Sequence, residues 1–223
     1  MESNRYSNIG KGGIVKEGIF NRFPDLIPAF SDNYWNNATH KRLMIVGESN
    51  YFDDNTDSVF KNPEEWYKGE DQQHLIPETK KTDVNNWKAY RSFDRLCKTI
   101  NNVLDSNCEH IYDEAAFYNY FLRPATVRGK NRSFKKDCTQ MDREAAGAAM
   151  CGIIDIDKPD IVIFVSKYAY LEFVKYSESN GYYSDILIDF VNHPAHPASW
   201  HHKNGNGIQK FEKLLKEHWI QRF

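Results

Sequence analysis

Cysteine is scarce in this sequence, and no two cysteines have the spacing of a metal-binding pair. The chain has 223 residues and only four cysteines. They are Cys97, Cys108, Cys138 and Cys151. Structural zinc and iron–sulfur sites commonly use pairs of cysteines with two residues between them, so this pattern argues against both kinds of centre. We expect reduced thiols and a cytoplasmic protein.

Long apolar stretches and an excess of one charge are missing too. No apolar run approaches the roughly 20 residues that a membrane-spanning helix needs. The opening residues also lack the apolar core of a signal peptide. The 31 acidic and 29 basic residues give a formal net charge of −2. We therefore expect no membrane partner, and nucleic-acid binding would depend on a local basic surface rather than on the total charge.

The most informative stretch that is present is LMIVGESNY, Leu43–Tyr51. Four apolar residues followed by a glycine and polar residues are typical of a strand that is buried on both faces. In open α/β sheets, ligand sites lie just past the carboxyl ends of such strands. The polar residues from Gly47 onward are therefore the first candidates for chemistry.

Strand-like and helix-like segments alternate along the chain. Apolar runs predict four strands, at Leu43–Val46, Ala115–Phe121, Ile161–Val165 and Ile186–Val191. Helical apolar spacing and good helix formers predict helices near residues 82–103, 139–156, 166–176 and 207–219. This alternation implies an α/β protein whose parallel sheet is covered by helices on both faces.

The length of the chain fits a single domain over residues 1–223. Residues 1–40 are rich in turn-forming glycine and proline, and we expect an N-terminal excursion there. Residues 53–82 form a long polar stretch, which predicts a loop or insertion of the kind that often has a function.

Histidines gather after the fourth predicted strand, in NHPAHPASWHHK at residues 192–203. They are His193, His196, His201 and His202. Their imidazoles could bind a metal, although the spacing matches no metalloprotease signature. A neutral imidazole at a strand end could instead donate a hydrogen bond to a developing oxyanion. The third interpretation is a surface turn that happens to carry histidines.

A basic segment follows the second predicted strand. Residues 123–136 contain six basic residues and no acid. Arg128, Lys130 and Arg132 lie near its middle. The segment could contact the phosphates of a nucleic acid, and a solvated charged loop is the alternative.

Taken in order, these motifs resemble the uracil-DNA glycosylase superfamily. The resemblance rests on GESNY at the end of the first strand, Asn119 near the end of the second, the segment PDIVIFVSKYAYLEF and a His-Pro turn after the last strand. It covers residues 43–223, with 53–82 poorly matched. It implies a three-layer α/β/α sandwich with a four-stranded parallel sheet of order 2-1-3-4. It also implies a pocket for a base that has been flipped out of the stack.

By this resemblance, GESNY matches the motif that places the hydrolytic water. Family members have Asp or Asn at its third position and Pro at its fourth, where this chain has Ser49 and Asn50. One branch has a glutamate at the second position, as this chain has in Glu48. Water activation is therefore expected from Glu48, helped by Ser49. Gly47 and Asn50 would line the base pocket, and Tyr51 would crowd the 5-position of the pyrimidine and exclude thymine.

The resemblance also implies roles for residues of the second and fourth strands. Asn119 would read the base, because an amide can accept from N3–H of uracil and donate to its O4. The His-Pro turn would stabilise the departing base anion through His193 or His196, and His193 is preferred because it follows the strand directly. Ser199 and Trp200 would contact nucleic acid, with Trp200 as an apolar wedge between bases.

The sequence therefore predicts hydrolysis of an N-glycosidic bond to a uracil-like pyrimidine in DNA or a nucleotide. This scheme requires no metal and no organic cofactor. Two alternatives stay open. One is a catalytically inactive module of the same fold that binds nucleic acid or a nucleotide, and the other is a metal-dependent hydrolase built on the histidines. The oligomeric state is open as well.

Overall fold

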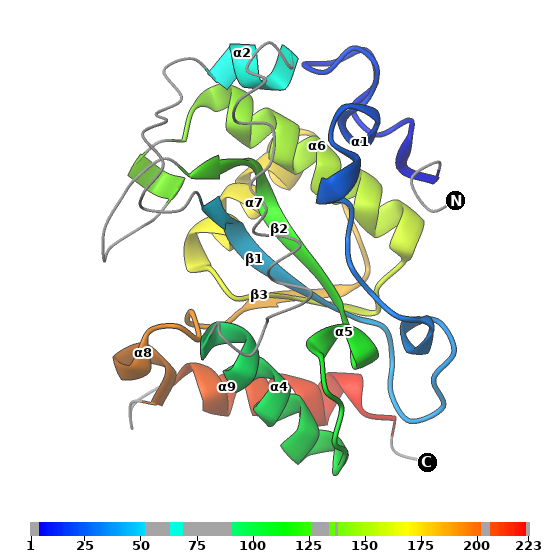
Figure 1. The fold of residues 1–223 in the computed structure, drawn as a ribbon, viewed down its shortest axis with the longest axis vertical. Helices are drawn as coiled ribbons and strands as arrows, with labels where there is room; N and C mark the ends of the chain where they lie inside the picture. The colour runs from blue at the N-terminus through cyan, green and yellow to red at the C-terminus, as the bar shows by residue number, and fades with distance from the viewer. Residues whose placement is uncertain are drawn as a thin grey trace.

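The computed structural model describes residues 5–51, 63–68, 91–125, 134–136, 138–201 and 206–221. These residues form a four-stranded, all-parallel sheet with the strand order β2-β1-β3-β4 (Figure 1). The strands are β1 (Leu43–Tyr51), β2 (Ala116–Ala125), β3 (Ile161–Phe164) and β4 (Leu187–Phe190). Helices cover both faces of the sheet. The predicted three-layer α/β/α sandwich with sheet order 2-1-3-4 is therefore confirmed.

β1 and β2 run further than the apolar runs predict. β1 continues past the predicted end at Val46 to Tyr51, because its polar end keeps pairing with β2. β2 likewise passes its predicted end at Phe121 and reaches Ala125. The pairing register shifts between Ser49 and Tyr51. The polar motif thus lies within a paired strand rather than in a loop after it.

The helices alternate with the strands as the sequence predicts. They are α1 (Ile19–Arg22), α2 (Pro63–Lys68), α4 (Arg91–Leu104), α5 (Ile111–Glu114), α6 (Gln140–Asp157), α7 (Lys167–Ser179), α8 (Pro197–His201) and α9 (Gly207–Leu214), which the π-helical turn η7 (Leu215–Trp219) continues. Short 3₁₀ turns are η2 (Pro24–Leu26), η3 (Asp32–Tyr34) and η6 (Phe134–Lys136). Within this described part of the chain, no helix is both long and apolar enough to cross a membrane.

Side-chain caps decide where two of these helices begin. The hydroxyl of Thr139 accepts from the N–H of Asp142 and starts α6 in a reciprocal capping box. The hydroxyl of Ser166 accepts from the N–H of Ala169 and starts α7 directly after β3. The predicted start of the helix near residue 82 lies outside the described residues, which show this helix from Arg91 as α4.

Alternation along β1 divides the interior into two cores. Met44 and Val46 pack on the face that α6, α7 and the N-terminal region cover. Leu43 and Ile45 pack on the other face, against α4, α8 and α9. Figure 1 shows these two layers above and below the sheet. Because successive side chains of a strand point to opposite faces, residues at the end of β1 face one layer or the other in turn.

The N-terminal region belongs to the core on the α6 and α7 face. Tyr6, Phe20 and Phe23 are buried there. The region also reaches the edge of the sheet, where Ala29 forms an antiparallel bridge with Phe117 of β2. Of the predicted long loop at 53–82, the structure describes α2, whose two aromatic side chains are buried in the same core.

Candidate functional site

Asn119 and Gly47 lie side by side near the carboxyl ends of β2 and β1. They are register partners in the parallel ladder. The amide of Asn119 lies so close over Gly47 that a Cβ atom at position 47 would come within 2.2 Å of the Asn119 Oδ1 atom. Any side chain at this position would displace the amide. The arrangement therefore requires glycine here.

A second asparagine holds the amide of Asn119. Its Nδ2 donates a hydrogen bond of 2.8 Å to Oδ1 of Asn50, which is buried. The two residues border a cavity of about 30 Å³. Its other lining residues are mostly apolar or aromatic: Leu26, Ile27, Ala29, Tyr112, Phe117 and Tyr118. A water molecule's share of liquid volume is roughly 30 Å³, so in this conformation the cavity fits a water rather than a pyrimidine ring.

Glu48 points to the opposite face of β1 from Gly47. Its Oε1 accepts the N–H of Phe134 over 2.7 Å, and its Oε2 accepts the hydroxyl of Ser166 over 2.6 Å. Ser166 also caps α7, and a helix N-terminus stabilises a nearby negative charge. Two elements, η6 and α7, therefore orient this carboxylate, and both of its oxygens accept a hydrogen bond.

Ser49 does not lie on the same side of β1 as Glu48, although the motif predicts that the two residues activate water together. Only 6% of its surface is exposed, and its hydroxyl has no hydrogen-bond partner among the described residues. The two-residue period of β1 places Ser49 on the face opposite to Glu48. The two side chains therefore do not form a pair. The side chain of Tyr51 lies outside the described residues, so its predicted role stays a prediction.

His193 follows β4 and is half-buried in its neutral form. Its Nδ1 accepts the N–H of Ala195 over 3.1 Å, which leaves the ring proton on Nε2. Burial, with a smaller contribution from the neighbouring His196, lowers the pKa of His193 to about 4, although the carboxylate of Glu48 acts to raise it. At pH 7, His193 is therefore a neutral imidazole with an Nε2–H donor, within electrostatic range of Glu48.

The structure distinguishes the two candidate histidines of the His-Pro turn. His196 is exposed, and its ring centroid lies 6.0 Å from that of His193. The backbone N–H of His196 donates to the carbonyl of His193 over 3.1 Å and so closes the turn. Only His193 has both partial burial and a ring nitrogen fixed as an acceptor. These features favour His193 for the motif position.

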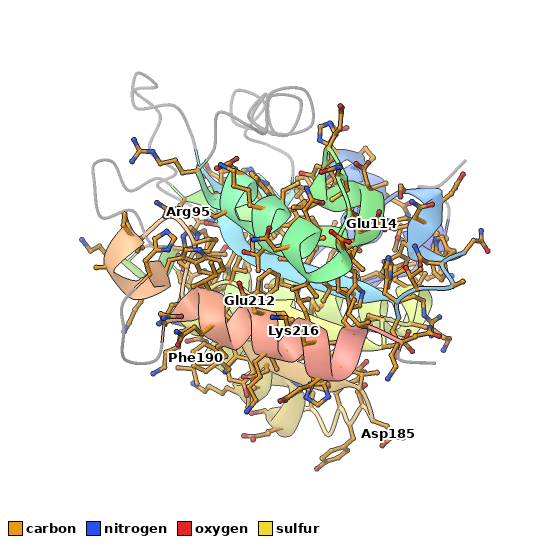
Figure 2. The ribbon with its side chains drawn as sticks, turned by 90° about the horizontal axis from the view of Figure 1, so that it is seen from below. Arg95, Glu114, Asp185, Phe190, Glu212 and Lys216 are labelled. Carbon is orange, nitrogen blue, oxygen red and sulfur yellow. The ribbon has the colours of Figure 1, made fainter. Side chains whose placement is uncertain are left out.

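Arg95 of α4 reaches the same turn, and no sequence pattern indicated it. Its guanidinium donates a hydrogen bond to the carbonyl of Pro194. Figure 2 shows Arg95 on α4, on the side of the molecule where α8 lies. An arginine on an amphipathic helix has no local signature for a contact with a backbone carbonyl far along the chain. Only the tertiary structure shows this partner.

No protein-family model matches this chain. No curated protein matches it either. What the site can do follows from its own residues and contacts.

A metal centre finds no support among the described residues. They contain no group of three or more His, Cys, Asp or Glu side chains that could hold a metal ion. The side chain of His201 is exposed, and His202 lies outside the described residues. The four cysteines, all within the described residues, form no disulfide there.

Trp200 is a core residue, so the prediction of an exposed DNA wedge is wrong. Its side chain is completely buried and packs against Gly207 and Phe211, with 6.1 Å between the ring centroids of Trp200 and Phe211. The reason is that residues 197–201 form α8, which turns this side chain toward α9. Ser199 is half-buried, and its hydroxyl donates to the carbonyl of His196 over 3.3 Å.

The predicted phosphate-binding residues Arg128, Lys130 and Arg132 lie outside the described residues, so their role stays a prediction. Arg123, at the start of the same basic segment, is fully buried. Its guanidinium forms a bidentate ion pair with Asp142, with hydrogen bonds of 2.9 and 2.8 Å. Arg123 therefore stabilises the core and is not part of a solvated basic loop.

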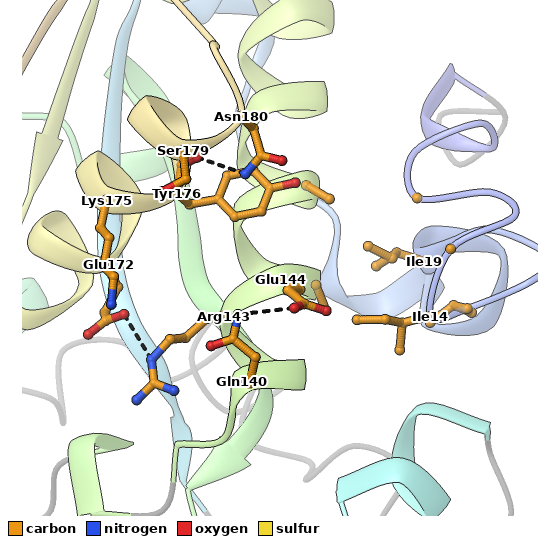
Figure 3. Close-up of a pocket in the computed structure, with 15 residues that line it drawn as sticks. Ile14, Ile19, Gln140, Arg143, Glu144, Glu172, Lys175, Tyr176, Ser179 and Asn180 are labelled. Carbon is orange, nitrogen blue, oxygen red and sulfur yellow. Dashed lines mark hydrogen bonds and ion pairs between the residues drawn. The ribbon is translucent and has the colours of Figure 1, made fainter.

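A larger cavity of about 410 Å³ lies between the N-terminal region and the helices α6 and α7 (Figure 3). Ile14 and Ile19 lie on one side, and Tyr176 lies opposite them. The ion pair of Arg143 and Glu172, with N–O distance 2.9 Å, borders the same cavity. None of the predicted site residues lines it. This cavity and the chemistry at the strand ends are therefore separate features.

Proposed function

We propose that the protein hydrolyses the N-glycosidic bond of a uracil-like pyrimidine in DNA or a nucleotide. The observation that carries the proposal is the state of His193, a neutral imidazole at a strand end whose tautomer leaves an Nε2–H donor. The carboxylate of Glu48 lies within electrostatic range of it. The resemblance of the sequence to the uracil-DNA glycosylase superfamily supports the same assignment of roles.

The chemistry of the bond explains why these groups suit it. The bond between C1′ of the sugar and the base nitrogen breaks with its electron pair on the base. The base leaves as an anion with charge on its oxygens, and the sugar becomes cation-like. In the proposed reaction His193 donates a hydrogen bond to a base oxygen, which stabilises the anion without transferring a proton.

Glu48 acts on the other side of the bond in this proposal. Its negative charge stabilises the cation-like sugar, and it orients a water whose oxygen forms the new bond to C1′. The water proton passes to the carboxylate and then to solvent, and the base anion takes a proton from solvent. The contacts with Phe134 and Ser166 hold the carboxylate in place for this role.

Asn119 is the proposed reader of the base. One hydrogen of its Nδ2 is used by Asn50, which fixes the orientation of the amide. The second hydrogen and the Oδ1 acceptor then form an edge that matches O4 and N3–H of uracil. Cytosine presents the opposite donor and acceptor pattern and would be rejected.

A catalytically inactive binding module is the second candidate, and specific observations favour it. Both oxygens of Glu48 accept hydrogen bonds, and the cavity beside Asn50 and Asn119 is smaller than a base. A protein of this kind would bind uracil-containing nucleic acid through the same residues without cleaving it.

The experiment is a cleavage assay on end-labelled single- and double-stranded oligonucleotides that contain one uracil. Protein purified from a host without its own uracil-excising activity is incubated with each substrate, and alkali then cuts at abasic sites. We expect abasic sites with the unaltered protein. We expect His193→Ala to lower kcat by about 10²- to 10³-fold, because it removes a donor to the developing anion.

The matched control is His218→Ala, which removes an exposed histidine from η7. It should cleave at the rate of the unaltered protein. Binding of the uracil oligonucleotide without abasic product would support the binding module. Neither binding nor product, on either strand form, would reject both candidates.

A further inference from the structure

We propose that α4 sets the spacing between the two halves of the site, which are the His193 turn and the end of β2 that carries Asn119. Arg95 is the positioning residue that holds the His193 turn. This inference rests on the proposed function, because the spacing matters only if His193 and Asn119 act on the same base. Its structural part, that Arg95 determines the state of His193, can be tested without any activity.

The turn that carries His193 has a backbone acceptor, the carbonyl of Pro194, that bonds to a partner outside the turn. Two N–H groups of the turn bond back to His193, that of His196 to its carbonyl and that of Ala195 to its Nδ1, each over 3.1 Å. Pro194 has no N–H, and its carbonyl accepts from the guanidinium of Arg95. The turn therefore closes through its own groups, and the hydrogen bond from Arg95 joins it to α4.

The same helix touches the strand that carries Asn119. Phe93 packs edge-on against Phe117, with 4.9 Å between the ring centroids, and Phe117 lies two residues before Asn119 on the same face of β2. Phe93 and Arg95 are two residues apart in α4, so a single turn of this helix contacts both halves of the site. A shift of α4 would move the His193 turn relative to Asn119.

The helix is well suited to this role because its own position is firmly set. Leu96 and Ile100 are buried in the core beneath the sheet. The hydroxyl of Thr99 donates to the carbonyl of Arg95 over 2.8 Å. Arg95 itself is half-buried, and its guanidinium is oriented by the hydrogen bond to Pro194.

The first measurement follows the imidazole nitrogens of His193 by NMR in protein labelled with ¹⁵N-histidine, between pH 3 and pH 8. In the unaltered protein, we expect Nδ1 to have the shift of an acceptor and the ring to titrate near pH 4. In Arg95→Ala, the turn loses its outside anchor, and we expect the titration to move toward the ordinary histidine value near 6.5. Arg91→Ala is the matched control, since it removes an exposed arginine one helical turn earlier.

The second measurement compares kcat and KM on the uracil oligonucleotide. Arg95→Ala should lower kcat by about 10²-fold while KM changes little, because misplacing a group that stabilises the transition state costs rate. Arg95→Lys keeps one donor and should recover part of kcat. Arg91→Ala should match the unaltered protein.

The two measurements separate the inference from the proposed function. A His193 signal that is identical in Arg95→Ala and the unaltered protein would overturn the positioning role, whatever the activity. A shifted signal in a protein without glycosylase activity would keep the positioning role and reject the reaction. If Arg95→Ala does not fold, the same titration on Arg95→Lys and Arg95→Gln decides, and unchanged His193 titrations in both would overturn the inference.

Discussion

The Oδ1 atom of Asn119 lies directly over Gly47, where a Cβ atom would come within 2.2 Å of it. Position 47 must therefore be glycine, because the amide of Asn119 on the neighbouring strand occupies the space that a side chain would fill. A hydrogen bond to Asn50 then holds the amide of Asn119 in this position. A change at position 47 should therefore act through Asn119.

Gly47→Ala should destabilise the protein by about 1–3 kcal/mol, the usual cost of overpacking a core. The added methyl group would displace the Asn119 amide and break its hydrogen bond to Asn50. Urea unfolding of four proteins tests this: the unaltered chain, Gly47→Ala, Asn119→Ala and the double variant. The loss caused by Gly47→Ala should be smaller when Asn119 is already alanine. Equal losses in both backgrounds would show that the methyl group clashes with something else.

Stability should fall between about pH 6.5 and pH 4 because of His193. Its folded pKa of about 4 lies below the ordinary value near 6.5. As the pH falls through this window, the unfolded chain takes up a proton that the folded chain does not, so stability present above pH 6.5 is lost. The difference in Tm between pH 7 and pH 4 should be smaller in His193→Gln than in the unaltered protein. His218→Gln, at an exposed position, should keep the full difference.

Arg123→Met should destabilise the protein by about 3–5 kcal/mol, because it leaves the buried carboxylate of Asp142 without its charged partner. Both side chains of this pair are fully buried. The matched control is Arg42→Met, which breaks the half-exposed pair of Arg42 and Asp160 and should cost only about 0–1 kcal/mol. Free energies from urea unfolding check both values. Similar losses in the two variants would contradict a special role for the buried pair.

Trp200→Ala should destabilise the fold by about 3–5 kcal/mol, as for other large buried aromatic side chains. Trp200→Phe should be much milder, because the indole N–H has no hydrogen-bond partner among the described residues to lose. Affinity for a uracil oligonucleotide should be unchanged in Trp200→Phe. A strong loss of affinity in this variant, with stability retained, would revive the wedge interpretation.

Much of the architecture could be predicted from local patterns. The apolar runs of the four strands, with helical segments between them, predict a parallel sheet. Adjacent parallel strands need a crossover connection, and a helix between two strands supplies it. The resemblance then named the strand order that the structure confirms. The strand ends were harder to predict. The polar end of β1 stays in the sheet because β2 continues alongside it, and a pairing partner is not visible in the strand's own residues.

The candidate site was only partly predictable for the same reason. Trp200 and Arg123 both stand in segments that look like surface loops, and both are fully buried. Each is held by a partner from another element, Phe211 of α9 for Trp200 and Asp142 of α6 for Arg123. The composition of a segment indicates whether it looks like a loop, but the burial of one of its side chains depends on which other elements pack against it.

By itself, the sequence determined the α/β class, the buried run of β1 and the gathering of polar residues at strand ends, because these follow from hydrophobic periodicity along the chain. Only the tertiary structure decided that His193 is half-buried whereas His196 is exposed, and that Glu48 and Ser49 face different layers. It alone revealed the contact of Arg95 with Pro194. These properties depend on desolvation and on hydrogen bonds between residues that are distant in sequence, and folding alone brings such groups together.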